Sequence, residues 1–318
     1  MRILFFGTSE FAVPSLEQLV TAHNTVVMCV TQPDRPQGRG RRLEASPVKR
    51  AAARLGVPLM QPERLERRLF EGLEADVGVV VAFGKLLRRD LLALPSHGLI
   101  GVHPSLLPAY RGAAPIHRAL LNGETTTGVT VFQLNEALDA GAILSQQAVA
   151  IEPEEDAQTL SERLARLVAA QLARVLEAVA AGQANPVSQD ESRATMAPKL
   201  TKTDGQIDWA APAAAICRLV RATVSWPGAA TTWRGRSLKV WAASVAGAAA
   251  DSSGEAPGTV VRIHRDGIDV ATGRGLLSMT DVQPADRRRM RAQEFLAGHP
   301  VHVGEILGGG TWKVESGK

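Results

Sequence analysis

His103 and Asp139 are the residues of this chain whose types and settings best suit acid–base chemistry. His103 ends the apolar run GLIGVH and precedes Pro104, which keeps the backbone before it extended. Its imidazole is therefore expected to project from the C-terminal end of a strand, where ligands of open α/β sheets bind. Asp139 lies in NEALDAGAIL, and a carboxylate there would orient the ring and raise its pKa. The pair predicts catalysis, although a structural histidine and an ordinary Asp-Ala-Gly turn remain alternatives.

A second candidate site is the arginine-rich stretch TQPDRPQGRGRRLEASPVKR, residues 31–50. Residues 32–50 carry 6 basic and 2 acidic side chains, whereas residues 1–184 as a whole carry 19 of each. Prolines and glycines exclude a helix before Ser46, so the arginines are expected on a loop. Such a loop suits a nucleic-acid backbone that orders it on binding, and it equally suits a solvated surface.

Strand and helix patterns alternate through the first half of the chain. Apolar runs predict strands at 2–6, 25–31, 76–82, 98–103, 129–134 and 142–150. Helical patterns lie between and after them, at 10–22, 46–55, 85–93 and 157–181. This alternation indicates parallel βαβ units, whose strands are buried on both faces. Residues 1–184 are therefore expected to form an α/β domain with a parallel sheet that positions His103.

The sequence pattern changes twice after residue 184. Residues 185–203 are polar and show little periodicity, so we predict a linker. In residues 204–318, the runs SLKVWAA, GTVVRIH, GIDVAT and GLLSMTDVQ are separated by turns such as RDG and TGRG. Short strands with such turns predict a small β-barrel or sandwich.

The composition of the 318 residues, 45% hydrophobic and 21% charged, is that of a soluble globular protein of about two domains. The N-terminal apolar run ends at Gly7 and does not have the pattern of a signal peptide, so we expect a cytoplasmic protein without a membrane partner. Cys29 and Cys217 lie in apolar stretches and are predicted to be free, buried thiols. The sequence contains no Walker A loop and no zinc-spaced Cys/His set, so no metal is predicted.

Longer stretches resemble a known family. HPSLLPAYRGAAPIHRAL, followed by GETTTGVTVFQLNEALDAGAIL, closely resembles the folate-dependent formyltransferases. TQPDRPQGRGRRLEASPVK is similar to the tRNA-binding loop of the members that act on initiator methionyl-tRNA. IDWAA, KVWAAS, PGTVV and VQPADRRRMRAQEFLAG are similar to the C-terminal domain of those members. The resemblance covers nearly the whole chain.

This resemblance implies a Rossmann-like formyltransferase domain, a linker and an OB-like β-barrel that binds tRNA. It implies transfer of the formyl group of 10-formyltetrahydrofolate to the α-amine of initiator methionyl-tRNA, and we expect a monomer. The residues matching the family's folate contacts are Ser105, Leu106, Leu107, Pro108, Ala82, Phe83, Gly84 and Leu86. Arg39, within the loop 32–42, matches the family's arginine that engages the acceptor end of the tRNA, and we expect Arg35, Arg39, Arg41 and Arg42 of this loop to bind tRNA.

One position departs from the family, whose catalytic set is Asn, His and Asp. The asparagine stands two residues before the histidine, and here that position is Gly101. Acyl transfer needs positioning, oxyanion stabilisation and a proton path. His103 is expected to supply the proton path and an oxyanion contact, and Asp139 to fix its tautomer. Loss of one donor typically costs about 10²–10³ in rate, part of which a water in the vacated space would return.

The sequence therefore predicts a slow transferase, unless Asn135 or a backbone N–H replaces the missing amide. A folate formyltransferase acting on an amino-sugar nucleotide or glycinamide ribonucleotide would share the HPSLLP core without needing the arginine-rich loop or the C-terminal domain. A non-catalytic tRNA- or folate-binding protein is favoured by Gly101 alone. Tyr110 and Arg111 are predicted either to contact substrate or to support their loop, and His117 to be structural or surface-exposed.

Overall fold

The computed structural model describes residues 1–22, 24–37, 42–246 and 254–308, and it forms two compact units. The first unit comprises Met1–Ile116, Thr125–Ile151 and Thr159–Pro198. The second comprises His117–Glu124, Glu152–Gln158 and Lys199–Lys318. Most of the segment expected to be a linker, residues 185–198, is thus part of the first unit.

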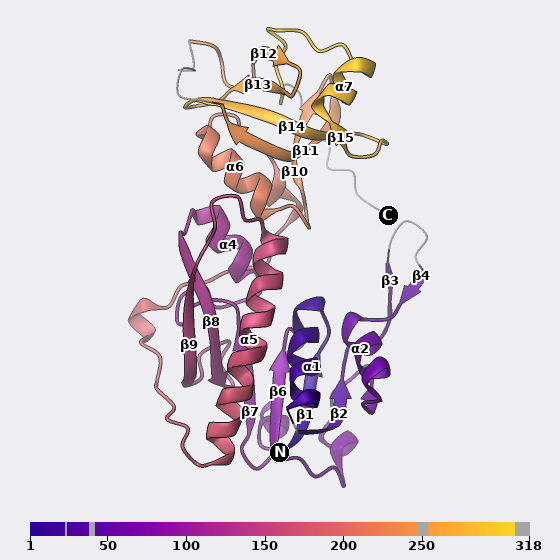
Figure 1. The fold of residues 1–318 in the computed structure, drawn as a ribbon, viewed down its shortest axis with the longest axis vertical. Coiled ribbons are helices and arrows are strands. Elements are labelled where there is room, and N and C mark those ends of the chain that lie inside the picture. The colour runs from indigo at the N-terminus through magenta and orange to yellow at the C-terminus, as the bar shows by residue number, and fades with distance from the viewer. Residues whose placement is uncertain (23, 38–41, 247–253, 309–318) are drawn as a thin grey trace. The chain divides into compact units, whose positions relative to one another are not determined.

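The first unit is built on a seven-stranded sheet with the order β5-β2-β1-β6-β7-β8-β9 (Figure 1). The first five of these strands are parallel to their neighbours, whereas β8 is antiparallel to β7 and β9 to β8. The parallel α/β prediction is therefore confirmed for most of the sheet, which ends in an antiparallel pair. The strands are β1 (Arg2–Gly7), β2 (Thr25–Val30), β5 (Leu59–Met60), β6 (Val77–Val81), β7 (Leu99–His103), β8 (Thr126–Gln133) and β9 (Ile143–Ala150).

All five residues of β7 are buried, as expected for an inner strand of such a sheet. Phe6, Phe83, Leu91 and Leu99 belong to one buried apolar cluster. Leu99 therefore anchors the start of β7 in this cluster, and the buried strand carries His103 at its other end.

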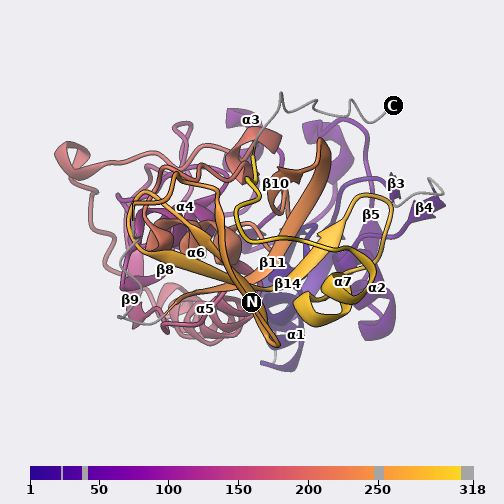
Figure 2. The same cartoon turned by 90° about the horizontal axis from the view of Figure 1, so that it is seen from above.

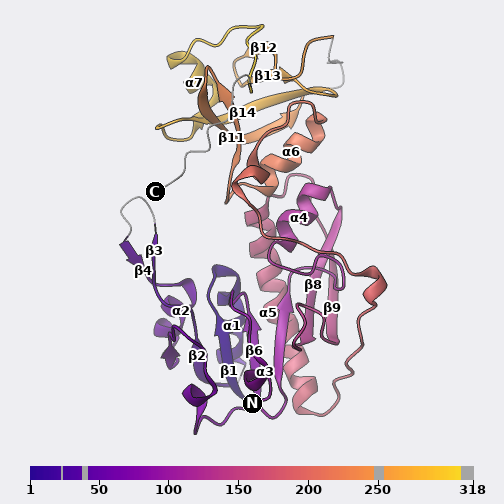
Figure 3. The same ribbon diagram turned by 180° about the vertical axis from the view of Figure 1, so that it is seen from behind.

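The helices of the chain mostly follow the predicted pattern, and Figure 3 shows those of the first unit from behind. The main exception is the helix expected at 85–93, which is reduced to α3 (Arg89–Leu92). The stretch 42–44 also differs from a plain loop, because β3 and β4 pair as a short antiparallel hairpin. The elements are η1 (Glu10–Ala12), α1 (Val13–Thr21), β3 (Arg35–Gln37), β4 (Arg42–Glu44), α2 (Pro47–Leu55), η2 (Arg67–Phe70), α4 (Pro115–Asn122), α5 (Ala157–Ala180) and η3 (Glu191–Arg193).

The second unit contains an antiparallel sheet with the order β10-β11-β14-β13-β12, and β15 pairs with β14 (Figure 1). Figure 2 shows β10, β11 and β14 of this sheet from above. Trp209 and Phe295 belong to its buried core. The prediction of a C-terminal β domain is confirmed, whereas its closure into a barrel stays a prediction. The elements are η4 (Lys202–Gly205), α6 (Ala213–Ala222), β10 (Ala229–Trp233), β11 (Arg236–Val245), β12 (Val260–His264), β13 (Gly267–Ala271), β14 (Leu276–Pro284), β15 (Met290–Arg291) and α7 (Ala292–Gly298).

Both cysteines are free thiols. Cys29 is buried and Cys217 is only partly buried, so the expectation of full burial was wrong for Cys217. Burial raises the pKa of the Cys29 thiol to about 12 and is the main cause that raises the pKa of Cys217 to about 11. In the described parts of the chain, no helix is long and apolar enough to cross a membrane.

Candidate functional site

The structure brings His103 and Asp139 together. His103 ends β7 and is 5% exposed. Its Nδ1 lies 3.6 Å from Oδ2 of Asp139, and its Nε2 lies 2.8 Å from the carbonyl oxygen of Tyr110. The first distance exceeds that of a hydrogen bond, whereas the second is within its range. The carboxylate thus faces the ring as predicted, and a backbone carbonyl that the sequence did not reveal holds the other nitrogen.

The contact with Tyr110 determines which nitrogen of His103 is basic. A carbonyl oxygen only accepts, so Nε2 donates the hydrogen bond and the neutral ring has its lone pair on Nδ1. Burial lowers the pKa of His103, and the charge of Asp139 and the bond to Tyr110 oppose this shift without reversing it. Asp139 raises the pKa as predicted, but desolvation of the imidazolium outweighs this attraction, so the net shift is downward. The tautomer is fixed by the Tyr110 carbonyl and not, as expected, by Asp139. A neutral imidazole is the form that accepts a proton.

Three non-glycine residues around the site have a left-handed backbone. The φ angles are 44° for Ala82, 62° for Tyr110 and 51° for Asp139. Such conformations cost about 1–3 kcal/mol each and persist where surrounding contacts impose them. The Asp139 carboxylate receives one such contact, because the N–H of Gly112 donates to its Oδ2 at 2.8 Å. The same oxygen faces His103.

The SLLP loop after β7 is held by two polar side chains from the neighbouring strands. The hydroxyl of Thr130 donates to the carbonyl of Ser105 at 2.7 Å and accepts from the N–H of Leu107 at 3.2 Å. Gln146 Nε2 donates to the carbonyl of Leu107 at 2.7 Å and to the Thr130 hydroxyl at 3.0 Å. Sequence reasoning missed Thr130 and Gln146, because nothing local links them to residues 105–108. Ser105 and Leu107 are buried, and Leu106 and Pro108 are half-buried.

The turn after β6 presents backbone rather than side chains. Ala82 and Gly84 are exposed, whereas Phe83 is buried and packs edge-on against Phe6. The Phe83 carbonyl accepts from Thr8 Oγ1 at 2.9 Å and from Gln32 Nε2 at 2.7 Å. Thr8 and Gln32 were missed, although each follows the C-terminal end of a parallel strand, a position typical of functional residues.

Leu86 is 81% exposed. It lines a separate hollow of about 310 Å³ together with Arg64, Lys85 and Arg88. The Leu86 side chain is thus exposed, whereas that of Phe83 is buried.

Gly101 sits in β7 between Val80 of β6 and Phe132 of β8. A Cβ at Gly101 would lie 2.5 Å from Cδ1 of Leu134 and 2.9 Å from two ring carbons of Phe132. Apolar side chains therefore crowd the point where a side chain at position 101 would begin, and a water in place of the amide stays a prediction.

Asn135 is not placed to replace the missing amide. His103 pairs with Thr130, whereas the N–H of Leu134 donates to the carbonyl of Leu99 at the opposite end of β7. Asn135 follows Leu134, and its Oδ1 accepts from the N–H of Ala137 within its own loop.

Arg111 supports its loop, which was one of the two predicted alternatives. Its guanidinium donates to Glu191 and Gln189 at 2.7–3.1 Å, and the residue is 6% exposed. The backbone of Tyr110 serves the same loop, since its N–H donates to Thr195 Oγ1 at 2.8 Å. His117 is half-buried, and burial lowers its pKa.

The arginine-rich stretch is anchored at its base. Asp34 pairs with Lys49 at 2.6 Å, and Gln61 donates to both Asp34 Oδ1 and the carbonyl of Gln32. The hydrogen bonds from Gln61 and Lys49 hold the pKa of Asp34 below its usual range. Of the four predicted tRNA-binding arginines, Arg35 is exposed on β3 and Arg42 is the first residue of β4. Arg39 and Arg41 lie outside the described residues.

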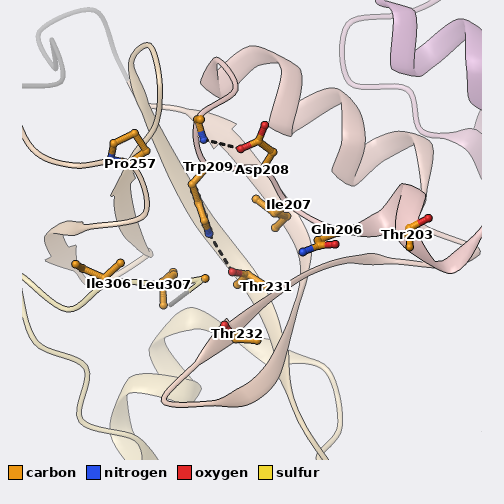
Figure 4. Close-up of a pocket in the computed structure, with 12 residues that line it drawn as sticks. Thr203, Gln206, Ile207, Asp208, Trp209, Thr231, Thr232, Pro257, Ile306 and Leu307 are labelled. Carbon is orange, nitrogen blue, oxygen red and sulfur yellow. Dashed lines mark hydrogen bonds between the residues drawn. The ribbon is translucent and has the colours of Figure 1, made fainter. Parts of the chain in front are cut away.

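The second unit carries a cavity of about 620 Å³ between residues 203–210, β10 and residues 306–308 (Figure 4). Trp209 Nε1 donates to Thr231 Oγ1 beside it, and Asp208 Oδ1 accepts from the N–H of Ala210. Its lining residues, as far as the structure describes them, include no histidine or cysteine. The cavity therefore lacks an acid–base pair like the one in the first unit.

A basic and aromatic surface also lies on the second unit. Lys239 and Arg289 approach the ring of Trp241 at 5.7 and 5.6 Å. Arg289 and Arg291 also pair with Asp281. Cations interleaved with an aromatic ring are typical of surfaces that contact nucleic acids.

The fold and the paired site match one protein family. Residues 1–176 match the family model described as formyl transferase, and residues 199–300 match the model described as formyl transferase, C-terminal domain. The chain therefore belongs to the formyl transferase family.

Relatives define the branch within this family. The chain is 45% identical to the methionyl-tRNA formyltransferase of Roseiflexus sp. (strain RS-1), over 100% of this chain and 98% of the relative. It is 46% identical to that of Chloroflexus aurantiacus (strain ATCC 29366 / DSM 635 / J-10-fl), over 96% and 99%. Within the formyl transferases the chain belongs to the methionyl-tRNA formyltransferases.

Solved structures share the fold at low identity. The N-formyltransferase from Helicobacter canadensis, solved with folinic acid and dTDP-3-aminofucose, has a TM-score of 0.65 at 14% identity. That match covers 88% of this chain and 99% of the other. HypX from Aquifex aeolicus, in complex with tetrahydrofolic acid, has a TM-score of 0.62 at 17% identity, covering 93% of this chain and 47% of the other.

Proposed function

We propose that this chain transfers the formyl group of 10-formyltetrahydrofolate to the α-amino group of initiator methionyl-tRNA. The observation that carries the proposal is the His103–Asp139 pair, with Nδ1 3.6 Å from the carboxylate, at the end of β7. It is supported by the match to methionyl-tRNA formyltransferases over the whole chain. The family models match a C-terminal domain, residues 199–300, in addition to the formyl transferase domain, residues 1–176.

We assign the proton transfers of this reaction to Nδ1 of His103, while Nε2 keeps its hydrogen bond to the carbonyl of Tyr110. An α-amine titrates near 8, so a fair fraction attacks as the neutral form at neutral pH. Nδ1 takes the proton that the attacking amine loses and later gives it to the nitrogen that leaves the formyl group. The imidazolium formed between these steps is stabilised by the Asp139 carboxylate and the Tyr110 carbonyl. No proton is left over, and no metal is needed.

Gly101 leaves the oxyanion with fewer donors in this proposal. An amide at this position would add a hydrogen bond, and its loss costs about 10²–10³ in rate. The protonated His103 is then the donor that contacts the oxyanion in this proposal. We therefore propose a transferase with slow turnover.

The proposed substrate contacts follow the family pattern. The formyl donor lies against the exposed backbone of Ala82 and Gly84 and against the loop after β7. The other folate contacts are Ser105, Leu106, Leu107, Pro108, Phe83 and Leu86. The tRNA contacts are Arg35, Arg39, Arg41 and Arg42, together with the basic surface of the second unit. The protein acts as a monomer in the cytoplasm.

The test offers the purified chain and labelled 10-formyltetrahydrofolate three acceptors: initiator methionyl-tRNA, an amino-sugar nucleotide and glycinamide ribonucleotide. The proposal expects label only on the methionyl-tRNA, and binding of the tRNA that weakens steeply with salt. Label on either other acceptor supports the related formyltransferases instead. Salt-dependent tRNA binding without transfer supports a non-catalytic binding protein.

A further inference from the structure

Gln189 makes hydrogen bonds with both ends of its carboxamide. Its Nε2 donates to the carbonyl oxygens of Asp139 and Gly141, each at 2.8 Å. Its Oε1 accepts from Nε and Nη2 of Arg111, at 3.1 and 2.7 Å. Gln189 therefore connects the turn that carries Asp139 to Arg111, which follows the SLLP loop.

Arg111, which donates to Gln189, is itself held by Glu191. Its guanidinium forms a two-pronged pair with Glu191, with both N···O distances at 2.8 Å. The Arg111 side chain is 8% exposed and that of Glu191 is 68% exposed. A guanidinium so deeply buried needs charged or polar partners in a fixed geometry, so its position also fixes the Gln189 oxygen. The hydrogen bond from Arg111 holds the pKa of Glu191 below its usual range.

The same segment holds the second neighbour of the His103 ring. The N–H of Tyr110 donates to Thr195 Oγ1 at 2.8 Å, and the N–H of Arg111 donates to the carbonyl of Thr195 at 2.8 Å. The carbonyl of Tyr110 is the partner of His103 Nε2. Residues 189–195 therefore contact both loops that flank the imidazole.

Asp139 needs such support because its backbone is strained. Its φ of 51° is in the left-handed region that an aspartate seldom adopts. Both hydrogen bonds from Gln189 go to backbone carbonyls of this turn. Without them the turn can relax toward an ordinary conformation, which carries the carboxylate away from Nδ1 of His103.

We propose that Gln189 is a positioning residue for the proposed formyl transfer: it holds the Asp139 turn so that the carboxylate faces Nδ1 of His103. The inference rests on the roles proposed above for His103 and Asp139. The charged groups involved are Asp139, which faces the imidazole, and Arg111, which faces Asp139 and Glu191. Gln189 itself acts only through the turn.

The experiment compares Gln189→Glu and Gln189→Met with the wild-type chain. Gln189→Glu keeps an oxygen that accepts from Arg111, but its second oxygen cannot donate to the carbonyls of Asp139 and Gly141. Gln189→Met removes both the donor and the acceptor. The His103 titration is followed by NMR with histidine labelled at Cε1 and assigned with His103→Asn. The pH profile of single-turnover formyl transfer is measured on the same proteins.

The proposal expects the His103 pKa to fall by about one unit in Gln189→Met, because the carboxylate that raises it has moved away, and by less in Gln189→Glu, whose added negative charge raises it. The acid limb of the rate profile moves to lower pH by the same amount, and kcat falls about tenfold while KM for methionyl-tRNA stays unchanged. Glu191→Gln, a change at an exposed residue, is expected to shift the titration in the same direction by less. The matched control is Gln183→Glu, at an exposed glutamine of the same segment, and it should leave both readouts unchanged.

A lowered melting temperature with an unchanged His103 titration in Gln189→Met and Glu191→Gln would overturn the proposal and leave Gln189 a purely structural residue. A wild-type chain that does not formylate methionyl-tRNA would instead overturn the proposed function. The NMR titration still tests the placement of Asp139 in that case, so the two failures are distinguishable.

Discussion

The ring of Phe132 stands against the backbone of Gly101. Two of its carbons lie 2.9 Å from the point where a Cβ at Gly101 would be, and Leu134 Cδ1 lies closer still, at 2.5 Å. Real Cβ atoms do not approach carbon atoms this closely, so any side chain at this position must displace its neighbours. The glycine therefore removes a donor from the proposed site and lets Phe132 of β8 and the following Leu134 close over the strand.

Replacing Gly101 with asparagine is therefore expected to strain the sheet. Gly101→Asn should lower the free energy of unfolding by about 1–3 kcal/mol, because Leu134 and Phe132 must move. Its single-turnover rate should nevertheless rise by about 10²–10³, because the amide restores the missing oxyanion donor once these side chains have moved. Gly101→Ala, which adds the Cβ without an amide, is the control and should destabilise the chain by a comparable amount. An asparagine variant that is no faster than the alanine variant would contradict the proposal that the missing amide limits the rate.

Thr130 is expected to matter for the formyl donor through the SLLP loop. It is fully buried, and Thr130→Val keeps its shape but leaves Leu107 N–H and Ser105 C=O without their partner. Unsatisfied buried polar groups cost about 1–3 kcal/mol, so denaturant unfolding should show a loss of that size. The loosened loop should also lower kcat/KM for 10-formyltetrahydrofolate. Thr127→Val, at a buried threonine of the same strand, is the control, and equal losses in both variants would refute a specific role for Thr130.

Gly84 combines a left-handed backbone with a close neighbour. Its φ is +77°, and a Cβ there would lie 2.7 Å from Gln32 Nε2, which holds the Phe83 carbonyl. Gly84→Ala should therefore displace the turn and raise KM for 10-formyltetrahydrofolate. Gly56→Ala supplies the matched control, because Gly56 has a φ of +68° with nothing within 4 Å of its Cβ. Both variants should lose about 1–2 kcal/mol of stability from the backbone alone, whereas a KM change in both would show that the turn is not responsible.

The buried His103 makes a pH-dependent contribution to stability. Its pKa is lowered in the folded chain relative to about 6.5 in the unfolded chain, so the unfolded state binds more protons between these two values. The contribution is complete above pH 6.5 and is lost as the pH falls through this window. His103→Asn should remove this part, so the difference in denaturation midpoint between the variant and wild type should change with pH below about 6.5. A difference that is the same at every pH would show that His103 has an unshifted pKa.

The sequence predicted the elements whose pattern is local and strong. The strand of His103 was predicted because an inner parallel strand is apolar throughout, and Pro104 limits how it ends. The helix expected at 85–93 mostly failed to form, and α6 was missed in an alanine-rich stretch that lacked a clear start. Alanine has the highest helix propensity, so the composition of this stretch itself favoured the helix.

The contacts that complete the site could not be predicted in the same way. Gln189 binds the Asp139 turn across 50 residues of sequence, and Tyr110 holds His103 through a backbone atom. The segment of Gln189 looked like a linker because its residues are polar and aperiodic. Its polar side chains are instead used in specific hydrogen bonds, which a pattern of apolar residues does not reveal. The direction of the His103 pKa likewise depends on burial that only the folded chain shows.

The central claim is that His103 and Asp139 together move the proton in formyl transfer. The most direct test is the single-turnover rate of transfer from 10-formyltetrahydrofolate to initiator methionyl-tRNA, measured for wild type, His103→Asn and Asp139→Asn at several pH values. The account predicts that wild type transfers the group with a rate that rises with pH as His103 loses its proton, and that His103→Asn loses about 10²–10⁴ in rate. Asp139→Asn should be slower than wild type, with its acid limb moved to lower pH. Rates for both variants within about threefold of wild type would contradict the account, because no transition-state contact would then depend on the pair.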